Sequence, residues 1–393
     1  MANIIKEETG FPVLFSKLFT EFFNSEKASG IILILCTAIS LIIANSGWGE
    51  GYAKIWQEEA GGLSVRYWIN DALMAVFFLL VGLEIERELY IGELSSIRNA
   101  SLPIIAAVGG MMVPAAFHFA INMGTPTVNG YAIPMATDIA FALGILALAG
   151  KSVPPALKIF LTALAIIDDL GAILIIAVFY TETVSLFYLM IALGIFAGLY
   201  LMGRMGVRRL LFYILPGIAL WYCMFRSGVH ATISGVLLAF AIPFGKGDQD
   251  SLSYRLQHSL HKPVAFVIVP LFALANTGIV LQPGFYSDLL SKNSIGIISG
   301  LVLGKPLGIL LFAWVGVKTR LSRLPLQVNW KHLLGVGLLA GIGFTMSIFI
   351  ALLAFDDESL VINSKIAILS ASCLAAIGGF ILLRTSGKKS VND

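Results

Sequence analysis

The stretch that decides the fold runs Ala156-Leu-Lys-Ile-Phe-Leu-Thr-Ala-Leu-Ala-Ile-Ile-Asp-Asp-Leu-Gly-Ala-Ile-Leu-Ile-Ile-Ala-Val-Phe179. It is almost wholly apolar and is long enough to cross a bilayer, which takes roughly 20 residues. Asp168 and Asp169 lie side by side near its centre. Two acids at that depth cost roughly 5 to 7 kcal/mol on insertion scales, and packing gains nothing from them. The pair therefore indicates a site that binds an ion.

The composition of the whole chain predicts an integral membrane protein built of helices. Its 393 residues are 58% hydrophobic and 12% charged, whereas soluble domains carry about 25% charged residues. The apolar runs are continuous rather than alternating, which argues against an outer-membrane barrel. A net charge of +3 gives no indication of a nucleic-acid partner. Cys36, Cys223 and Cys373 lie in apolar runs with no partner nearby in the sequence, so we expect neither disulfides nor a cysteine metal site.

Apolar windows predict an all-α fold with about twelve transmembrane helices in a single membrane domain over residues 1–393. An amphipathic pattern over 11–24, with apolar residues at three- and four-residue steps, predicts an interfacial helix before the first span. The predicted spans lie near 28–46, 68–84, 100–122, 130–150, 156–180, 185–203, 208–224, 229–244, 262–281, 294–317, 331–355 and 361–383.

The distribution of basic residues predicts the orientation of these spans. With the N-terminus in the cytoplasm, 20 of the 26 Lys and Arg residues fall on the inner side and five on the outer side, with Lys305 inside a span. This bias favours two cytoplasmic termini and an even number of spans. The longest outer segment, 45–67, is rich in glycine and contains Trp48 and Trp56, and it predicts a small folded hairpin.

Few ionisable groups are expected well inside the spans. They are three acids, Asp138, Asp168 and Asp169, and one base, Lys305. A further acid, Asp71, lies near the outer end of the second span. Pro134 lacks a backbone donor, so the helix carrying Thr137 and Asp138 is expected to be kinked or unwound near the acid. The glycine-rich run 335–343 is compatible either with close helix packing or with a second broken helix that faces the first.

A buried Lys305 needs a carboxylate partner to keep its charge, and both Asp168 and Asp169 are candidates. Neighbouring helical residues point about 100° apart, so one acid can face the lysine while the other faces a water-filled cavity. Two carboxylates roughly 6 Å apart repel by about 2.8 kcal/mol at an effective dielectric constant of about 20. A site with this repulsion can hold either protons or a small cation, which is the property of an exchanger.

Four stretches resemble NhaA-type sodium/proton antiporters, and the resemblance runs from about residue 15 to residue 385. It is carried by Ala136-Thr-Asp-Ile-Ala-Phe-Ala-Leu-Gly144, Ala165-Ile-Ile-Asp-Asp-Leu-Gly171, Trp68-Ile-Asn-Asp-Ala-Leu-Met-Ala-Val-Phe-Phe78 and Phe266-Val-Ile-Val-Pro-Leu-Phe-Ala-Leu-Ala-Asn-Thr-Gly278. The resemblance implies twelve helices in inverted repeats, with the fourth and eleventh broken and crossing.

The resemblance also implies roles for the charged residues. Asp169 would be the main ligand of Na⁺ or Li⁺, and Asp168 would pair with Lys305 and exchange protons. Thr137 and Asp138 would line the site, with Asp138 balancing the half-helix dipoles. One Na⁺ or Li⁺ would leave for two imported protons, driven by the membrane potential, as a core bundle moves against an interface bundle.

The same resemblance implies a bacterial inner-membrane protein that needs no cofactor and serves sodium and pH homeostasis. Its partners would be Na⁺, Li⁺, H⁺, membrane lipid and a second copy, with the 45–67 hairpin as the dimer contact. A charged cytoplasmic cluster resembles the family's pH-sensing region and comprises Glu84, Arg87, Glu88, His258 and His261. Gln257 departs from the family pattern, which has Glu there. The two histidines are equally compatible with ordinary interfacial residues.

Other functions fit the sequence less well. An intramembrane aspartyl protease would carry a Gly-x-Gly-Asp signature, which none of these acids has. Ser227-Gly-Val-His230 is a poor serine-protease pattern, and His230 is interpreted as a packed or interfacial residue. A passive cation channel is disfavoured by the fixed charge of Lys305 beside the acids. A symporter for an organic solute would need more intramembrane polar groups. The chain is therefore not predicted to be an enzyme.

Overall fold

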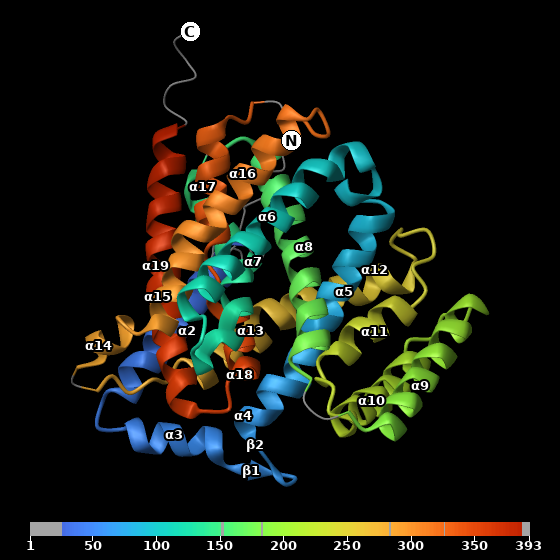
Figure 1. The fold of residues 1–393 in the computed structure, drawn as a ribbon. Helices are drawn as coiled ribbons and strands as arrows, with labels where there is room; N and C mark the ends of the chain where they lie inside the picture. The colour runs from blue at the N-terminus through green and yellow to red at the C-terminus, as the bar shows by residue number, and fades with distance from the viewer. Residues whose placement is uncertain (1–25, 151–152, 182–183, 283, 326, 387–393) are drawn as a thin grey trace, which may run out of the picture.

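The computed structural model describes residues 26–150, 153–181, 184–282, 284–325 and 327–386, so the amphipathic helix expected over 11–24 lies outside the described residues. The described chain is helical apart from one short hairpin (Figure 1). Its elements are α2 Glu26–Ala44, α3 Gly49–Gln57, β1 Glu59–Ala60, β2 Leu63–Ser64, α4 Val65–Trp68, η1 Ile69–Leu73, α5 Met74–Tyr90, η2 Glu93–Ser95, α6 Ile97–Asn122, η3 Pro126–Met135, α7 Ile139–Leu148, α8 Pro155–Phe179, α9 Leu186–Arg204, α10 Leu211–Ser227, α11 Ile233–Ala241, α12 Leu252–Pro263, η5 Val264–Ile268, α13 Val269–Asn276, α14 Phe285–Leu289, α15 Lys292–Ser299, η6 Gly300–Gly304, α16 Lys305–Lys318, α17 Trp330–Ala340, α18 Phe344–Ala354 and α19 Glu358–Ser386.

The predicted class, a helical multi-pass membrane protein, is confirmed. Among the described residues, seven helices are long and apolar enough to cross a membrane, and the number rises to ten if each of three bent helix pairs is one span. Two more of the predicted windows fall on the shorter helices α10 and α11. All twelve predicted windows therefore coincide with helical segments, although length and composition alone identify at most ten as spans.

The outer segment 45–67 contains a helix followed by a hairpin. The chain bends by 115° between α2 and α3 and then forms the antiparallel strands β1 and β2. The turn between the strands uses Gly61 and Gly62, both at positive φ, where other residues are strained. Trp68 donates its indole N–H to the carbonyl of Ala60 over 2.7 Å, which ties the hairpin to the start of the next span.

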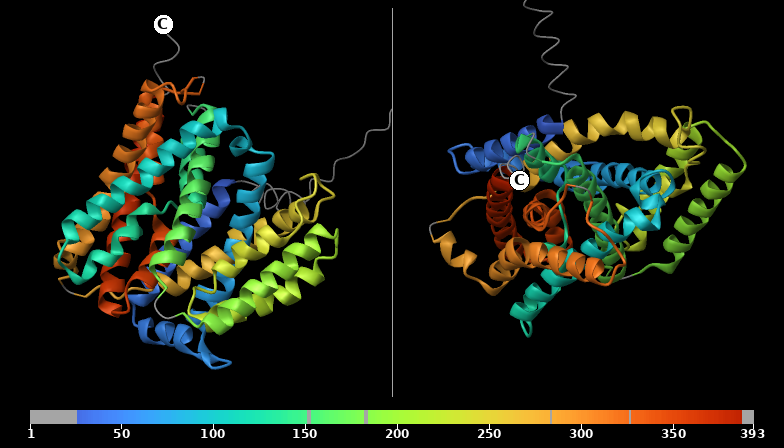
Figure 2. Two further views of the ribbon diagram at one scale, coloured as in Figure 1. Left: turned by 45° about the vertical axis from the view of Figure 1, so that its right-hand side comes forward. Right: turned by 90° about the horizontal axis from the view of Figure 1, so that it is seen from above.

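The helices divide into a large packed body and a smaller peripheral group (Figures 1 and 2). Helices α6, α8, α15, α16, α17 and α19 lie together, and α9 and α10 lie at the opposite edge. The main hydrophobic core belongs to the first group, and smaller clusters join α9, α10 and α11. Apolar side chains on the outer faces of α9 and α10 stay exposed, as expected of surfaces that contact lipid; they include Phe187, Met190, Leu215 and Ile218.

Two of the spans are interrupted, and their interruptions meet. Helices η3 and α7 form one pair, bent by 46° at residues 136–138, and α17 and α18 form the other, bent by 47° at residues 341–343. The backbone N–H of Asp138 donates to the carbonyl of Ile342 over 2.7 Å, so the two breaks lie against each other. The glycine-rich run thus contains a second broken helix, and Gly337 in the same run also packs closely against Pro306. In the sequence, the first broken span lies between the long helices α6 and α8, and the second lies between α16 and α19.

Helices α6 and α16 approach so closely that glycine is required on both. A Cβ atom on Gly308 would collide with the backbone of Gly109, and one on Gly109 would collide with the backbone of Gly308. Such close contact between glycines is a common way for membrane helices to pack. It holds α16, the helix that begins with Lys305, against α6.

Gly308→Ala is expected to destabilise the protein, because the added methyl group forces α6 and α16 apart. Overpacking of this kind costs about 1–3 kcal/mol. Thermal melting of the purified protein in detergent should show a lower transition temperature. Gly194→Ala is the matched control, since a Cβ at Gly194 on α9 would meet no atom within 4 Å. Equal melting temperatures for Gly308→Ala and the parent protein would contradict the close contact.

Candidate functional site

Asp168 and Lys305 form a buried ion pair between α8 and α16. The Nζ atom of Lys305 lies 2.7 Å from Oδ2 of Asp168, and neither side chain is exposed. The same Oδ2 atom accepts a hydrogen bond from the hydroxyl of Thr137 over 2.7 Å. Lys305 begins α16 directly after the π-helical turn η6, and its Nζ also donates to the carbonyl of Met135. Of the two carboxylates, Asp168 is therefore the one paired with the lysine.

Asp169 has a different environment, although it is the next residue of the same helix. Its side chain is 2% exposed, and within the described part of the chain its carboxylate has no hydrogen bond or ion pair. Asp168, Asp138, Glu84 and Lys305 all act electrostatically on it, and three of these four groups are acids. One oxygen of Asp168 also lacks a partner among the described residues. Burying an unpaired carboxylate is costly, so this arrangement is stabilised when a proton or a cation binds.

Asp138 links the N-terminal ends of two half-helices. Its Oδ1 atom accepts from the backbone N–H of Phe141 over 2.9 Å at the start of α7. Its Oδ2 atom accepts from the backbone N–H of Thr345 over 3.1 Å at the start of α18, and also from the Thr345 hydroxyl. Helix N-termini carry partial positive charge, so one carboxylate balances both.

The C-terminal ends of the other two half-helices face donors. The carbonyl of Met135, the last residue of η3, accepts from Lys305. The carbonyl of Ala340, the last residue of α17, lies 2.9 Å from the Thr137 hydroxyl. Since helix C-termini carry partial negative charge, a cation and a hydroxyl are favourable there. The crossed breaks thus bring carboxylate, hydroxyl and carbonyl oxygens together, which are the ligands that hard cations prefer.

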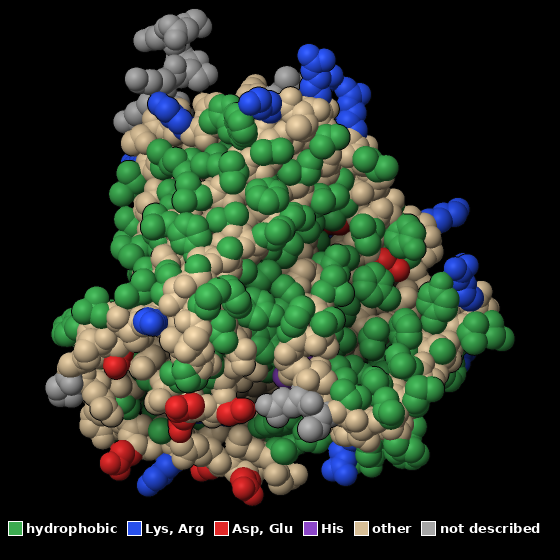
Figure 3. Space-filling view, viewed as in Figure 1, with side chains coloured by type: hydrophobic (Ala, Val, Ile, Leu, Met, Phe, Trp, Pro, Cys, Tyr) green, Lys and Arg blue, Asp and Glu red, His purple; other side chains and the backbone are tan. Residues whose placement is uncertain are grey.

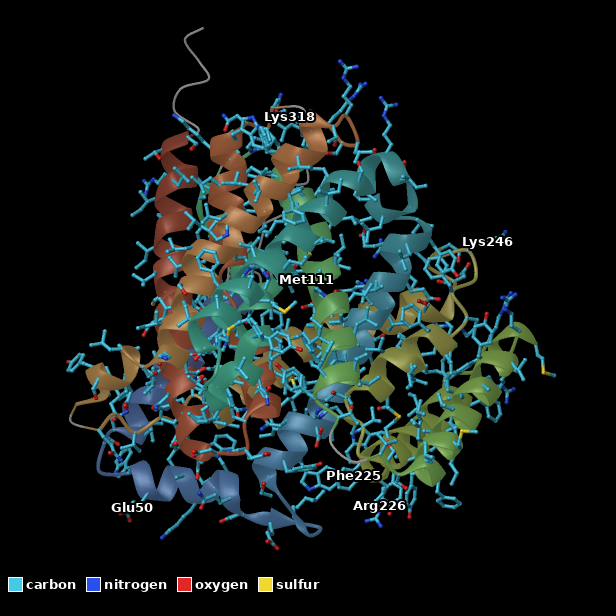
Figure 4. All side chains as sticks on the ribbon, in the orientation of Figure 1. Glu50, Met111, Phe225, Arg226, Lys246 and Lys318 are labelled. Atoms are coloured by element: carbon cyan, nitrogen blue, oxygen red, sulfur yellow. The ribbon has the colours of Figure 1, made fainter. Side chains whose placement is uncertain are left out.

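A cavity lies on the same helix as the acid pair, towards the N-terminal end of α8. It has a volume of about 430 Å³ and lies between the end of α5 and α8. Its wall includes Glu88, Glu93, Lys158 and Thr162. Asp169 lies seven residues beyond Thr162 on α8, which is about 10 Å along a helix. Further along α8, Met111 of α6 fills the space that Gly171 leaves, so the two helices pack closely there (Figure 4).

The expectation of three buried acids and one buried base was incomplete. The structure also buries Glu86 and Lys365, which are 5% and 6% exposed, and His118, which is not exposed. The burial of Glu86 and Lys365 could have been predicted from the buried apolar residues spaced around them on one face of each helix. Glu86 follows the buried Leu79 and Leu83 on one face of α5, and Lys365 lies between Val361 and Ile368 on the buried face of α19. Both residues lie close enough to a span end in the sequence to pass for interfacial charges.

The residues expected to sense pH come together at the contact between α5 and α12. Nδ1 of His261 lies 3.9 Å from Oε1 of Glu84. The guanidinium of Arg87 lies over the ring of Tyr254, which in turn stacks on His258. Glu88 accepts the backbone N–H of Glu93 over 2.9 Å, at the rim of the cavity between α5 and α8. Gln257 is half-buried on α12 beside this group.

His230 lies elsewhere, at the other end of the peripheral group. Its Nε2 atom is 2.8 Å from the carbonyl of Tyr180, so the ring connects the segment after α8 with the segment before α11. Among the described residues, no group of three or more His, Cys, Asp or Glu side chains is arranged to hold a metal ion. The three cysteines are unpaired in the structure.

Comparison with known proteins identifies the family. The family model described as Na⁺/H⁺ antiporter 1 matches residues 20–383. A protein of Flavobacterium johnsoniae named Na(+)/H(+) antiporter NhaA 1 is 57% identical over 94% of this chain and 97% of its own length. Antiporters named NhaA from Dechloromonas aromatica and Vibrio cholerae are 59% and 49% identical, each over 94% of this chain and over 96% and 98% of their own lengths. The chain therefore belongs to the Na⁺/H⁺ antiporter 1 family of multi-pass membrane transporters.

Proposed function

We propose that this protein exports Na⁺ or Li⁺ in exchange for about two protons, with Asp169 and Asp168 as the shared binding site. The observation that carries the proposal is the carboxylate of Asp169, which is buried without a partner next to the Asp168–Lys305 pair and the crossed helix breaks. An ion that binds there must supply positive charge, and both a proton and Na⁺ can do so. Competition for one site is sufficient for exchange.

The chemistry of the pair supports two protons per cation. When Na⁺ occupies Asp169, both carboxylates are needed in their charged form, and Asp168 can turn from Lys305 towards the cation. When Na⁺ binds, Lys305 loses its carboxylate partner and its ammonium group releases a proton. When Na⁺ leaves, Asp169 takes one proton and the Lys305 amine takes the second, which restores the Asp168–Lys305 ion pair. Exchange of two protons for one Na⁺ moves one net charge, which is worth about 2.3 kcal/mol per 100 mV of membrane potential. Transport is therefore electrogenic in this proposal.

The proposed orientation places the cavity between α5 and α8 on the cytoplasmic side of the inner membrane. Lys and Arg side chains gather at the upper end of the molecule in Figure 3, and Asp and Glu side chains gather at its lower end. The positive-inside rule then assigns the upper end, and both termini, to the cytoplasm. The access cavity carries Glu88 and Glu93, whose charge favours the approach of cations from that side.

Two further parts of the proposal concern the assembly. The helix α3 and the hairpin β1–β2 protrude at the lower end of the molecule, and we propose them as the contact with a second copy (Figure 1). Sodium and pH homeostasis is the proposed physiological role. The residues Glu84, Arg87, Glu88, His258 and His261 are proposed to tune the rate with pH. Four of them link α5 to α12 through the Glu84–His261 contact and ring contacts, and Glu88 lies at the rim of the cavity between α5 and α8.

The experiment that tests this function uses purified protein in liposomes with a proton-sensitive dye inside. Na⁺, Li⁺, K⁺ or choline is added outside, with the membrane potential either clamped or free. Proton movement is expected with Na⁺ and Li⁺ only, and it should change with the imposed potential. The apparent KM for Na⁺ should rise as pH falls, because protons compete for the same carboxylates. Absence of Na⁺-dependent proton movement at every neutral or alkaline pH would overturn the proposal.

Gln257→Glu is expected to shift the pH at which transport becomes half-maximal. The substitution places a carboxylate one helical turn before His261 on α12, and its negative charge favours proton binding within the cluster. Proton binding to the cluster then persists to a higher pH, so the pH profile should move in the alkaline direction by about half a unit, on the order of the effect of one exposed charge. Asn329→Asp, an amide-to-acid change at the far end of α17, is the control. An unmoved profile would exclude Gln257 from pH regulation.

A further inference from the structure

A second cavity adjoins the first and shares Glu93, Asn99, Ile159 and Ala163 with its wall, but the rest of its lining has a different chemistry. It has a volume of about 530 Å³ and lies between α6, α8 and the segment that follows α16. Three arginines line it: Arg98 from α6 and Arg320 and Arg323 from the segment after α16. Among the described residues, Glu93 is the only acid in its wall, so this lining carries a net charge of +2.

The arginines have no partners of their own. Within the described residues, none of the three guanidinium groups makes an ion pair or a hydrogen bond. The carboxylate of Glu93 is held by the side-chain amide of Asn99 over 3.3 Å rather than by an arginine. The cavity therefore presents unused hydrogen-bond donors around one space.

The opposite wall of the same cavity is apolar. Leu102 of α6 and Phe160 of α8 form its base and are each 3% exposed. At its rim, Ile159 and Leu321 leave 47% and 68% of their surfaces exposed. A free inorganic anion would contact the arginines and leave this apolar surface uncovered. A molecule that combines a phosphate group with hydrocarbon covers both walls.

The position of the cavity agrees with that chemistry. Lys318, the last residue of α16, lies at the upper end of the molecule in Figure 4, where basic side chains gather in Figure 3. Arg320 follows two residues later with φ of 60°, a conformation that long side chains rarely adopt. The turn there is closed by the hydrogen bond from the backbone N–H of Ser322 to Gly316 over 3.0 Å. The arginines thus lie at the ends of membrane-spanning helices, at the level where lipid head groups are found.

We infer that this cavity binds the head group of an anionic phospholipid. The phosphate contacts Arg98, Arg320 and Arg323, and the acyl chains leave the cavity past Ile159 and Leu321. Arginine is well suited to the task, because its planar fork donates two hydrogen bonds to one phosphate. The bound lipid joins α6, α8 and the end of α16. Since α8 carries Asp168 and Asp169 and α16 carries Lys305, the lipid stabilises the arrangement of helices that holds the buried ion pair.

The test compares two variants that remove the same charge from the same end of the molecule. Arg320→Gln/Arg323→Gln removes two cavity arginines, and Lys331→Gln/Arg384→Gln removes two exposed cations outside the cavity. Binding of phosphatidylglycerol to the delipidated full-length protein is measured by native mass spectrometry and by the rise in melting temperature. Each arginine is expected to contribute roughly fivefold to affinity, so the cavity variant should bind about 30-fold more weakly. The control variant should bind like the parent protein.

Several outcomes would overturn the inference. One is equal affinity of both double variants for phosphatidylglycerol. Another is an equal rise in melting temperature with phosphatidylcholine, which would show that negative charge is not recognised. A third is the same rise with inorganic phosphate at the same concentration, which would assign the cavity to a soluble anion. Arg98→Gln provides a second variant that leaves the turn after α16 untouched, and it should weaken lipid binding about fivefold. Neither readout depends on transport.

Discussion

Asp169→Asn is expected to abolish Na⁺-driven proton movement while leaving the protein as stable as before, or more so. The amide has nearly the same shape as the carboxylate but carries no charge, so it can neither neutralise Na⁺ nor hold a proton. We expect the transport rate to fall at least about 100-fold, which corresponds to about 2.7 kcal/mol. Because Asp169 is buried and has no hydrogen bond or ion pair to a described residue, removing its charge takes no contact from the fold. Lost transport together with unchanged stability would show that Asp169 binds the transported ions and does not hold the fold together.

The measurement is the liposome dye assay together with thermal melting of the same preparations. Asp357→Asn is the control, because Asp357 is exposed between α18 and α19 and the substitution changes the same chemical group. It should leave transport intact. Substantial Na⁺-driven proton movement in Asp169→Asn would show that another group binds the cation. A large fall in melting temperature would instead indicate that Asp169 has a structural partner.

Lys305→Met is expected to have the largest effect on stability of any single substitution at the site. Methionine keeps most of the length and apolar volume of the side chain but removes the ammonium group. Asp168 then remains as a buried carboxylate with only the Thr137 hydroxyl as its partner, and the carbonyl of Met135 loses its donor. Breaking a buried ion pair from one side costs about 3–5 kcal/mol. Proton uptake per Na⁺ should also fall, because the pair that takes the second proton is gone.

A double-mutant cycle tests the pair directly. Lys305→Met/Asp168→Asn removes both charges, so its melting temperature should recover part of what Lys305→Met loses, with a coupling of at least about 1 kcal/mol. Lys318→Met on the same helix is the control, since Lys318 is exposed and lies over the ring of Trp314. Additive effects of the two single substitutions would contradict the ion pair. An unchanged number of protons per Na⁺ in Lys305→Met would contradict its part in proton coupling.

Much of the fold could be predicted because each span carries its own signal. A run of apolar residues that matches the thickness of the bilayer forms a helix, whatever its neighbours do, since lipid leaves the backbone no other partner. The break near Thr137 could likewise be predicted from a neighbouring residue, because Pro134 lacks a backbone donor. The break at 341–343 was less certain from sequence, because glycine serves both close packing and helix interruption. Gly337 lies against Pro306, so this glycine serves close packing. The helix is interrupted only after Ala340, the last residue of α17.

The burial of individual charges was harder to predict, because it depends on which face of a helix meets other helices. Glu86 and Glu84 are two residues apart on α5, yet only Glu86 is buried. Lys365 is one of the five basic residues that the orientation prediction placed on the outer side of the membrane, and the structure buries its side chain in α19. Hydropathy windows average over all faces of a helix, so they do not distinguish these positions. The apolar spacing around Glu86 and Lys365 does distinguish them, but only once helix packing is considered.

The sequence by itself determined that the chain forms membrane helices, that two acids lie within one of them, and that a lysine elsewhere needs one of the two. It could not decide from the residues alone which acid that is, because adjacent helical positions differ only by a rotation of about 100°. Tertiary packing determines which acid pairs with the lysine. Helix α16 approaches the face of α8 that carries Asp168, and Asp169 has no partner among the described residues. Packing also placed Asp138 between the starts of α7 and α18. These contacts join residues that are up to about 200 positions apart, and only the folded arrangement of the helices brings them together.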